Sequence, residues 1–170
     1  MDRSQQRSFN SMEITGYFPG VIGKITELHA VYYNENWGFD VSFEVQVGSE
    51  LSDFISEYNN KRDGFWVSKV DDDFAGCVAI DGRKADSDGV RLRWFIVAPR
   101  YHGKGIGSLL MREAVKFCRE TGHKQVFLWT FEGLDAARAL YEREGFRLCE
   151  EHRVRQWGQK INEQKFKLIL

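Results

Sequence analysis

The spacing of apolar residues predicts two helices in the first third of the chain. Val21, Ile25 and Leu28 recur at helical spacing after a Pro-Gly pair. Apolar side chains at this spacing line one face of an α-helix, so we expect a helix over residues 21–34. Apolar residues recur in the same way over residues 49–60, which predicts a second helix.

The other apolar runs are short and are bounded by turn residues, which is typical of strands. Expected strands span residues 65–70, 74–80, 90–97, 125–130 and 146–150. The segments 154–157 and 164–169 predict a closing hairpin, and the polar residues 81–89 predict a loop. Longer amphipathic stretches predict helices over residues 106–120 and 134–144.

In chain order, these elements predict an α/β protein with a mixed sheet flanked by helices. Antiparallel strands come first, and the helix over residues 106–120 then joins two strands that must be parallel. The length of 170 residues suits one domain with a substantial core. Residues 1–12 are polar and aperiodic, so we expect a flexible tail there and one domain over residues 13–170.

Charge and hydropathy exclude several classes of protein. Acidic and basic residues are interleaved, with a formal net charge of −1, which argues against nucleic-acid and membrane partners. No apolar run approaches the roughly 18 residues of a membrane span, and no signal peptide is recognisable. We therefore expect a cytoplasmic protein.

The cysteines point to the same compartment. Cys77, Cys118 and Cys149 lie in apolar segments and lack the C-x-x-C spacing of redox and zinc sites. We expect buried, reduced thiols, as in a cytoplasmic protein. No cluster of histidines and cysteines has metal-ligand spacing, so no metal is expected.

The most specific motif follows the strand expected at residues 90–97. Gly103, Gly105 and Gly107 alternate there and leave backbone N–H groups uncovered at a helix N-terminus, where a phosphate binds well. Their spacing fits neither a Walker A loop nor a dinucleotide fingerprint. It does fit R-x-x-G-x-G, beginning at Arg100.

This motif resembles the loop with which acyltransferases of the GNAT superfamily bind the pyrophosphate of coenzyme A. The segment from Ala137 to Phe146 resembles a second family pattern, A-x-x-L-Y-x-x-x-G-F. The resemblance implies the GNAT fold and an acetyl-CoA-dependent N-acetyltransferase without a metal. Such an enzyme acetylates a primary amine, here of an unidentified small molecule or peptide, by direct attack in a ternary complex. The alternative is a non-catalytic acyl-CoA-binding sensor domain.

The resemblance also implies which residues contact coenzyme A. The backbone at the end of the strand is expected to pair with the pantetheine arm, and the loop N–H groups with the pyrophosphate. Arg100 or Lys104 would offset the phosphate charge. The implied contacts are Phe95, Ile96, Val97, Arg100, His102, Gly103, Lys104, Gly105, Ile106, Gly107, Ser108 and Ala137.

Tyr141 is the general acid that the resemblance implies, because a phenol can protonate the departing thiolate. The same position also suits a tyrosine that packs on the sheet. Many relatives carry an asparagine at the position of Leu134, so that cofactor contact is in doubt. We expect the neighbouring Asp135 to cap the helix instead.

The general base is open at this point. The family often uses a glutamate on the central strand, where this chain has Arg93 and Trp94. An attacking amine must lose a proton to a carboxylate, a histidine or a water. The candidates by location are Glu44, Glu132, Glu150, His152 and an ordered water. His29 and His123 are expected on helix surfaces.

Other segments suggest a subgroup. Leu128-Trp129-Thr130-Phe131 and Gln156-Trp157-Gly158 resemble the acetyltransferase half of MarR–GNAT fusion proteins. The aromatic residues that either line an acceptor pocket or pack in the core are Tyr32, Tyr33, Trp37, Phe39, Trp129 and Trp157. Members of the family often form homodimers, but the sequence determines neither the oligomeric state nor the acceptor amine.

Overall fold

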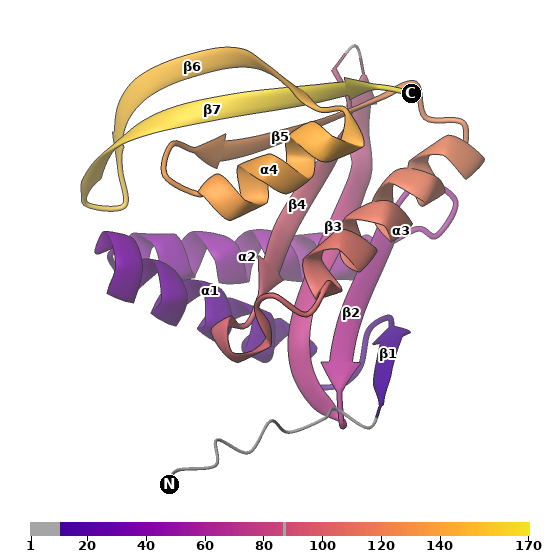
Figure 1. The fold of residues 1–170 in the computed structure, drawn as a ribbon, viewed down its shortest axis with the longest axis horizontal. Helices are drawn as coiled ribbons and strands as arrows, with labels where there is room; N and C mark the ends of the chain where they lie inside the picture. Colours follow the sequence, from indigo (N-terminus) through magenta and orange to yellow (C-terminus); the bar gives the residue numbers. More distant parts are fainter. Residues whose placement is uncertain (1–10, 87) are drawn as a thin grey trace, which may run out of the picture.

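A mixed sheet of seven strands forms the centre of the protein (Figure 1). The computed structural model describes residues 11–86 and 88–170. The strands lie in the order β1-β2-β3-β4-β5-β7-β6. They are β1 (Met12–Thr15), β2 (Gly64–Val70), β3 (Asp73–Asp86), β4 (Gly89–Val97), β5 (Gln125–Phe131), β6 (Arg147–Gln156) and β7 (Gln159–Ile169). The α/β class and the parallel pairing of β4 with β5 are confirmed.

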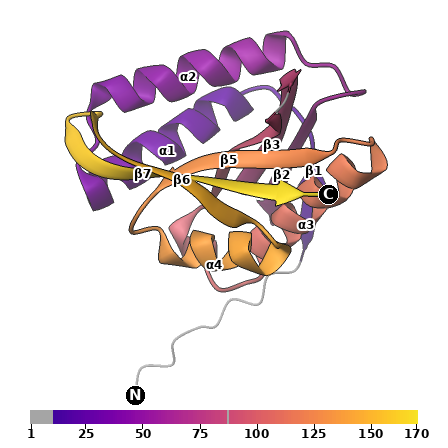
Figure 2. The same cartoon turned by 90° about the horizontal axis from the view of Figure 1, so that it is seen from above.

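Helices cover both faces of the sheet, with α1 and α2 on one face and α3 and α4 on the other (Figure 2). They are α1 (Val21–Trp37), α2 (Val41–Ser56), α3 (Ile106–Glu120) and α4 (Asp135–Glu144), with a 3-10 turn at Pro99–Tyr101. The bounds of α3 are as predicted. Its apolar stripe, which includes Leu110 and Ala114, is buried, and Gly122 (φ 79°) supplies the left-handed stop after its end.

The second helix begins at Val41, well before residue 49, where the apolar spacing placed it. Asp40 is its N-cap, because the Ser42 N–H donates to Asp40 Oδ1 at 3.0 Å. Phe43 and Val47 are buried in its first turns. An N-cap aspartate at a helix start is a recognisable signal, so this boundary could have been predicted.

The strands β3 and β6 are longer than predicted. Residues 81–86, predicted as a loop, continue β3 alongside β4. Gly82 permits this because the strand passes close to another segment: a Cβ there would lie 2.6 Å from the Arg62 carbonyl oxygen. The segments predicted at 146–150 and 154–157 belong to the single strand β6, apart from residues 146 and 157, and β6 forms the predicted hairpin with β7.

The parallel strands β4 and β5 diverge along their length (Figure 1). Within the described residues they pair only at Val90↔Val126 and Arg91↔Phe127. A bulge at Trp94, whose φ is 50°, shifts the register of β4 against β3. A bulge bends its strand, so β4 turns away from β5 and the two strands separate toward their C-terminal ends.

The cysteine prediction is confirmed in two of three cases. Cys77 and Cys118 are buried, and burial raises the pKa of both thiols. The prediction for Cys149 is wrong, because β6 is the edge strand of the sheet and this side chain is exposed.

The predicted tail lies mostly outside the described residues. Residues 1–10 are not among them, whereas Met12 is the first residue of β1, which pairs with β2. The apolar pattern of β1 is too short to predict a strand. Across residues 11–86 and 88–170, no helix combines the length and the apolar character that a membrane crossing requires.

Candidate active site

The glycine loop leads the chain from β4 into α3 and leaves its N–H groups uncovered. Gly103 and Gly105 have φ values of 72° and 81°, a left-handed conformation that favours glycine. A Cβ at either position would meet no atom within 4 Å. The N–H groups of both donate to no backbone carbonyl of the described residues. The first turn of α3 adds N–H groups that no intrahelical carbonyl can reach, so the loop has the geometry that suits an anion.

Gly107 has a different role, in packing. A Cβ at this position would lie 3.1 Å from Leu140 Cδ1 and 3.4 Å from Phe95 Cζ. The absence of a side chain therefore lets α3 lie close to α4 and to the end of β4. The first two glycines shape the loop, and the third sets the distance between the walls beside it.

A groove of about 660 Å³ runs beside this loop and is termed the loop groove. Its volume falls within the roughly 300–1,000 Å³ of ligand pockets. Its walls come from α1, the end of β4, the loop and α4. The predicted cofactor contacts that line it are Phe95, Ile96, Val97, His102, Gly103, Gly105, Ile106, Gly107, Ser108 and Ala137.

The two predicted cations lie outside the loop groove. The Arg100 guanidinium lies 3.5 Å from the Asp73 carboxylate, and Lys104 is exposed beside the groove without lining it. Arg143 on α4 lines the groove instead. Helical spacing could have revealed it, because Arg143 follows Ala139 by one turn on the same face.

The end of β4 directs main-chain groups toward the gap between β4 and β5. Successive residues of a strand direct these groups to opposite sides. The Ile96 carbonyl faces β3, since a Cβ on Gly76 would lie 2.6 Å from its oxygen. The groups of Phe95 and Val97 therefore face the gap. His102 Nε2 donates to the Val97 carbonyl at 2.7 Å, which leaves the Phe95 groups and the Val97 N–H directed at the gap.

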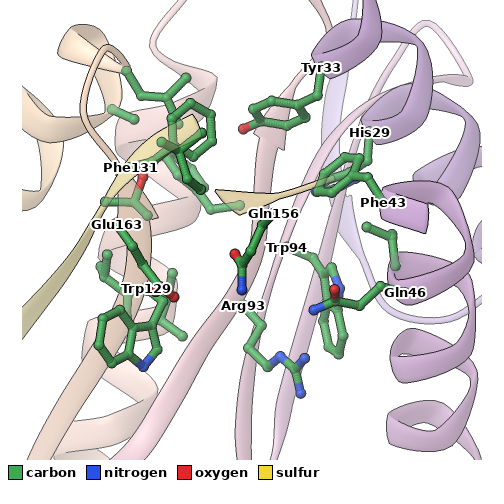
Figure 3. Close-up of a pocket in the computed structure, with 18 of the residues that line it drawn as sticks. His29, Tyr33, Phe43, Gln46, Arg93, Trp94, Trp129, Phe131, Gln156 and Glu163 are labelled. Carbon is green, nitrogen blue, oxygen red and sulfur yellow. The ribbon is translucent and has the colours of Figure 1, made fainter. Parts of the chain in front are cut away.

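A second cavity, of about 220 Å³, lies at this gap on the side of α1 and α2 and is termed the gap cavity (Figure 3). The tip of the β6–β7 hairpin closes one side of it. Trp157 Nε1 donates to Gln46 Oε1 at 2.9 Å, and the Trp157 ring packs against Phe43 with 5.0 Å between centroids. The C-terminal hairpin is thus fastened to α2 over the cavity.

The two cavities adjoin. The residues that line both are Tyr33, Phe95, Leu134 and Ala137. A ligand in the loop groove can therefore meet a ligand in the gap cavity at this boundary. The arrangement can bring together two molecules, one in each cavity.

The predicted aromatic residues divide between the two cavities and the core. Tyr33, Trp129 and Trp157 line the gap cavity, whereas Tyr32 and Trp37 line the loop groove, which Tyr33 also borders. The sixth, Phe39, is buried and packs against Trp157, with 4.9 Å between ring centroids.

Tyr141 lies on α4 and lines the gap cavity. Its ring packs against Phe95 and Phe146, with centroids 6.0 and 6.2 Å away, and the residue is 5% exposed. Burial raises its pKa, so the hydroxyl is protonated at neutral pH and can donate. Tyr33 faces it from α1; burial also raises the pKa of Tyr33, and the nearby Tyr141 adds to that increase.

The charged side chains of the gap cavity are unequally paired. Arg93 contacts Glu50 and lies 3.2 Å from Asp81. Arg91 and Glu163 also line the cavity, and neither forms an ion pair with a described residue. Among the described residues, no group of three or more His, Cys, Asp or Glu side chains is placed to hold a metal ion.

The four side chains proposed as general base lie elsewhere. Neither Glu44, Glu132, Glu150 nor His152 lines the gap cavity, and all four are exposed. Their sequence positions suggested proximity, but β7 lies between β5 and the edge strand β6, so Glu163 of β7 lines the cavity and its register partner His152 of β6 does not. The strand alternation around Glu163 was the signal that could have identified it.

The prediction that His29 decorates a helix surface is wrong. His29 is 5% exposed and lines the gap cavity, and its Nδ1 donates to the Ile25 carbonyl at 2.8 Å. Burial lowers its pKa to about 4, although the bond to Ile25 opposes this decrease. His29 is therefore neutral at pH 7. His123 is half-buried, and its Nε2 donates to the Arg62 carbonyl at 3.1 Å.

This burial predicts that the protein loses stability in mild acid. Unfolded His29 binds a proton below about pH 6.5, but the folded protein resists protonation down to about pH 4. The unfolded state then holds more protons, so the free energy of unfolding should fall by about 3 kcal/mol as pH drops through this window. Denaturant titrations from pH 4 to 7.5 should show a smaller decrease in His29→Gln. An equal decrease in both proteins would contradict this assignment.

The prediction that Asp135 caps α4 is wrong. Leu134 is the N-cap residue and makes no side-chain capping bond, while Asp135 is the first helical residue. Asp135 thus places its charge in the first turn, where the helix dipole favours an acidic group. Leu134 lies at the boundary of the two cavities.

The sequence is similar to those of known proteins. Residues 24–146 match the model of the Acetyltransferase (GNAT) family. N-acetylaspartate synthetase of Xenopus tropicalis is 34% identical over 116 residues, which cover 65% of this chain and 42% of that protein. N-acetyltransferase family 8 member 2 of Rattus norvegicus is 30% identical over 101 residues, covering 58% of this chain and 45% of that protein. The chain thus spans less than half the length of these curated relatives.

Solved structures share the fold. A Salmonella typhimurium protein, yncA, solved with its cofactor acetyl-CoA, has a TM-score of 0.75 at 16% identity and matches 94% of each chain. Ribosomal-protein-alanine N-acetyltransferase from Brucella melitensis has a TM-score of 0.74 at 15% identity, covering 93% of this chain and 99% of that one. With the glycine loop, the separated strands and the family match in agreement, the chain belongs to the GNAT family of acetyltransferases.

Proposed function

We propose that the protein transfers the acetyl group of acetyl-CoA to an amine held in the gap cavity, by direct attack within a ternary complex. The contact between the loop groove and the gap cavity at Phe95 carries this proposal. A thioester that follows the loop groove reaches this boundary, and an amine in the gap cavity reaches it from the other side. No enzyme nucleophile needs to intervene.

The loop groove suits coenzyme A along its length. The N–H groups of Gly103 and Gly105 and the first turn of α3 would bind the pyrophosphate. Arg143 supplies a cation on the opposite wall. The main-chain groups of Phe95 and the Val97 N–H would pair with the pantetheine amides as an added strand.

The chemical step needs one proton acceptor and one proton donor. The amine nitrogen attacks the acetyl carbonyl carbon, the carbon–sulfur bond breaks, and the amine loses a proton. Glu163 is our proposed general base. The other carboxylate that lines the gap cavity, Glu50, is paired with Arg93, and the buried His29 is too weak a base. Tyr141 is the proposed general acid, whose protonated hydroxyl donates to the departing sulfur.

A thiol-release assay with acetyl-CoA and a panel of amines tests the proposal. The expected result is release of coenzyme A that depends on the amine, with the N-acetyl product identified by mass spectrometry. Tight acetyl-CoA binding without turnover for amino acids, polyamines and peptides would instead favour the acyl-CoA sensor.

Alanine in the glycine loop should weaken acetyl-CoA binding. In Gly105→Ala, a Cβ is added at φ 81° in the open space over the loop, where the phosphates would lie. We expect the Kd for acetyl-CoA to rise roughly tenfold, the equivalent of one charge-assisted hydrogen bond. Gly122→Ala is the matched control, because Gly122 has φ 79°, open surroundings and a position remote from the groove. Calorimetry should show unchanged binding in the control; equal loss in both variants would refute the loop's role.

We also propose a subgroup, a cellular compartment and an oligomeric state. The sequence segments quoted above support a relationship to the acetyltransferase half of MarR–GNAT fusion proteins. Free Cys77, Cys118 and Cys149 support a reducing compartment such as the cytoplasm. We propose a homodimer because members of the family often form one, and analytical ultracentrifugation would test this.

A further inference from the structure

Two buried polar atoms of the gap cavity make no hydrogen bond. In residues 11–86 and 88–170, the buried side-chain atoms without a partner are Ser68 Oγ, Arg91 Nε and Gln156 Oε1. The last two belong to residues that line the gap cavity. Buried polar atoms are otherwise almost always paired, because an unpaired one destabilises the fold. Two such atoms beside one cavity point to a ligand that pairs with them.

The two atoms require opposite partners. Arg91 Nε is a donor and needs an acceptor, whereas Gln156 Oε1 is an acceptor and needs an N–H or O–H donor. Figure 3 shows Gln156 in the middle of the cavity, between Trp129 and Trp94. A ligand that satisfies both atoms therefore carries an acceptor and a donor.

The carboxylates of Glu50, Asp81 and Glu163 act on the charge of Arg91 from a distance, and none of them forms an ion pair with it. Arg93, two residues along β4, contacts Glu50 and lies 3.2 Å from Asp81. Arg91 has no ion-pair partner in the described part of the chain. Burial and the nearby Arg93 lower the pKa of Arg91 to about 10, although Glu50, Asp81 and Glu163 oppose this decrease, so the guanidinium keeps its charge at neutral pH. A partly buried cation in this state attracts an anion.

We infer that the acceptor is a small amine that also carries a carboxylate, such as an amino acid. The carboxylate accepts hydrogen bonds from Arg91, and the amine donates to Gln156 Oε1 and faces Glu163. This inference rests on the proposed function, because it names the acceptor of that reaction.

The size and charge of the cavity support this class over other amines. Its volume of about 220 Å³ lies below the roughly 300–1,000 Å³ of pockets for larger ligands. A polyamine would add positive charge beside Arg91 and Arg93 and would leave Arg91 Nε unpaired. An amino acid fills both unmet requirements with one molecule.

Matched pairs of acceptors test the inference on the unmodified protein. Each amino acid is compared with its α-carboxamide: alanine with alaninamide, and phenylalanine with phenylalaninamide. Putrescine represents amines without a carboxylate. Two readouts are taken: thiol release from acetyl-CoA, and the thermal shift that each amine causes in the coenzyme A complex. We expect a KM roughly 10- to 100-fold lower for the carboxylate member of at least one pair.

Substitution of Arg91 then tests whether this residue causes the preference for acceptors with a carboxylate. In Arg91→Met, a side chain of similar length without charge, the difference between the paired acceptors should disappear while the KM for acetyl-CoA stays constant. Arg91→Lys should restore part of it. Arg119→Met removes an exposed arginine of α3, remote from the cavity, and should change nothing.

The outcomes separate the two proposals. Equal use of paired acceptors, or preference for putrescine, in both readouts overturns the carboxylate inference and leaves the acetyltransferase proposal standing. Absence of thiol release with every amine, together with carboxylate-selective thermal shifts that Arg91→Met abolishes, overturns the acetyltransferase proposal and upholds the carboxylate site.

Discussion

Replacing Tyr141 by phenylalanine should lower kcat by roughly 100- to 1,000-fold, the usual contribution of a positioned proton donor. The substitution removes one hydroxyl and keeps the ring, whose contacts with Phe95 and Phe146 hold α4 in place. The KM for acetyl-CoA should change little, since the hydroxyl acts on the sulfur only as it departs. Steady-state kinetics with a saturating amine measures both constants.

Tyr33→Phe is the informative comparison, because Tyr33 presents a second buried hydroxyl beside the first. We expect a smaller loss of kcat there. Tyr141 lies one helical turn after Ala137, which borders both cavities, so its hydroxyl is the better placed for the sulfur. A larger loss in Tyr33→Phe would transfer the acid role to α1, and full activity in both variants would exclude a phenolic acid.

Glu163→Gln should lower kcat/KM for the amine by roughly 100-fold or more near neutral pH. The amide has the shape of the carboxylate but cannot accept the proton of the attacking amine. At higher pH more of the amine is already neutral, so the variant should recover activity as the pH rises. A purely structural defect would lack this recovery, which makes the pH–rate profile the decisive measurement.

Glu132→Gln serves as the matched control, because Glu132 is an exposed carboxylate near the end of β5 that lies outside both cavities. It should keep the wild-type rate at every pH. If Glu163→Gln also keeps it, the proton passes through water or another group.

The fold was predictable wherever short-range pattern and long-range packing agree. The helix α3 has its predicted bounds because an apolar stripe, a glycine entry and Gly122 at its exit all indicate the same element. The predicted bounds of β3 were wrong because a residue within it packs against a segment that is distant in the sequence. Gly82 suggested a loop, yet it is the place where β3 passes the Arg62 carbonyl, and no local pattern reveals such an approach.

In the site, too, residues of a contiguous motif were predicted, and residues brought together by long-range packing were not. The loop residues from Gly103 to Ser108 line the loop groove as a contiguous motif would, and Ala137 joins them from α4. Arg91 and Glu163 were missed because they come from strands on either side of β5. Their meeting depends on the divergence of β4 and on the register of β7, and sequence distance conveys neither.

The hairpin fastened to α2 by Trp157 and Gln46 has a consequence for engineering. The proposed contacts with the donor come from the stretch between the end of β4 and α4, which α1 faces across the loop groove. The proposed contacts with the acceptor come from Arg91 of β4 and from Gln156 and Glu163 of the β6–β7 hairpin. The hairpin supplies only acceptor contacts, so grafting another hairpin tip onto this chain should change the accepted amine while the acetyl donor stays the same.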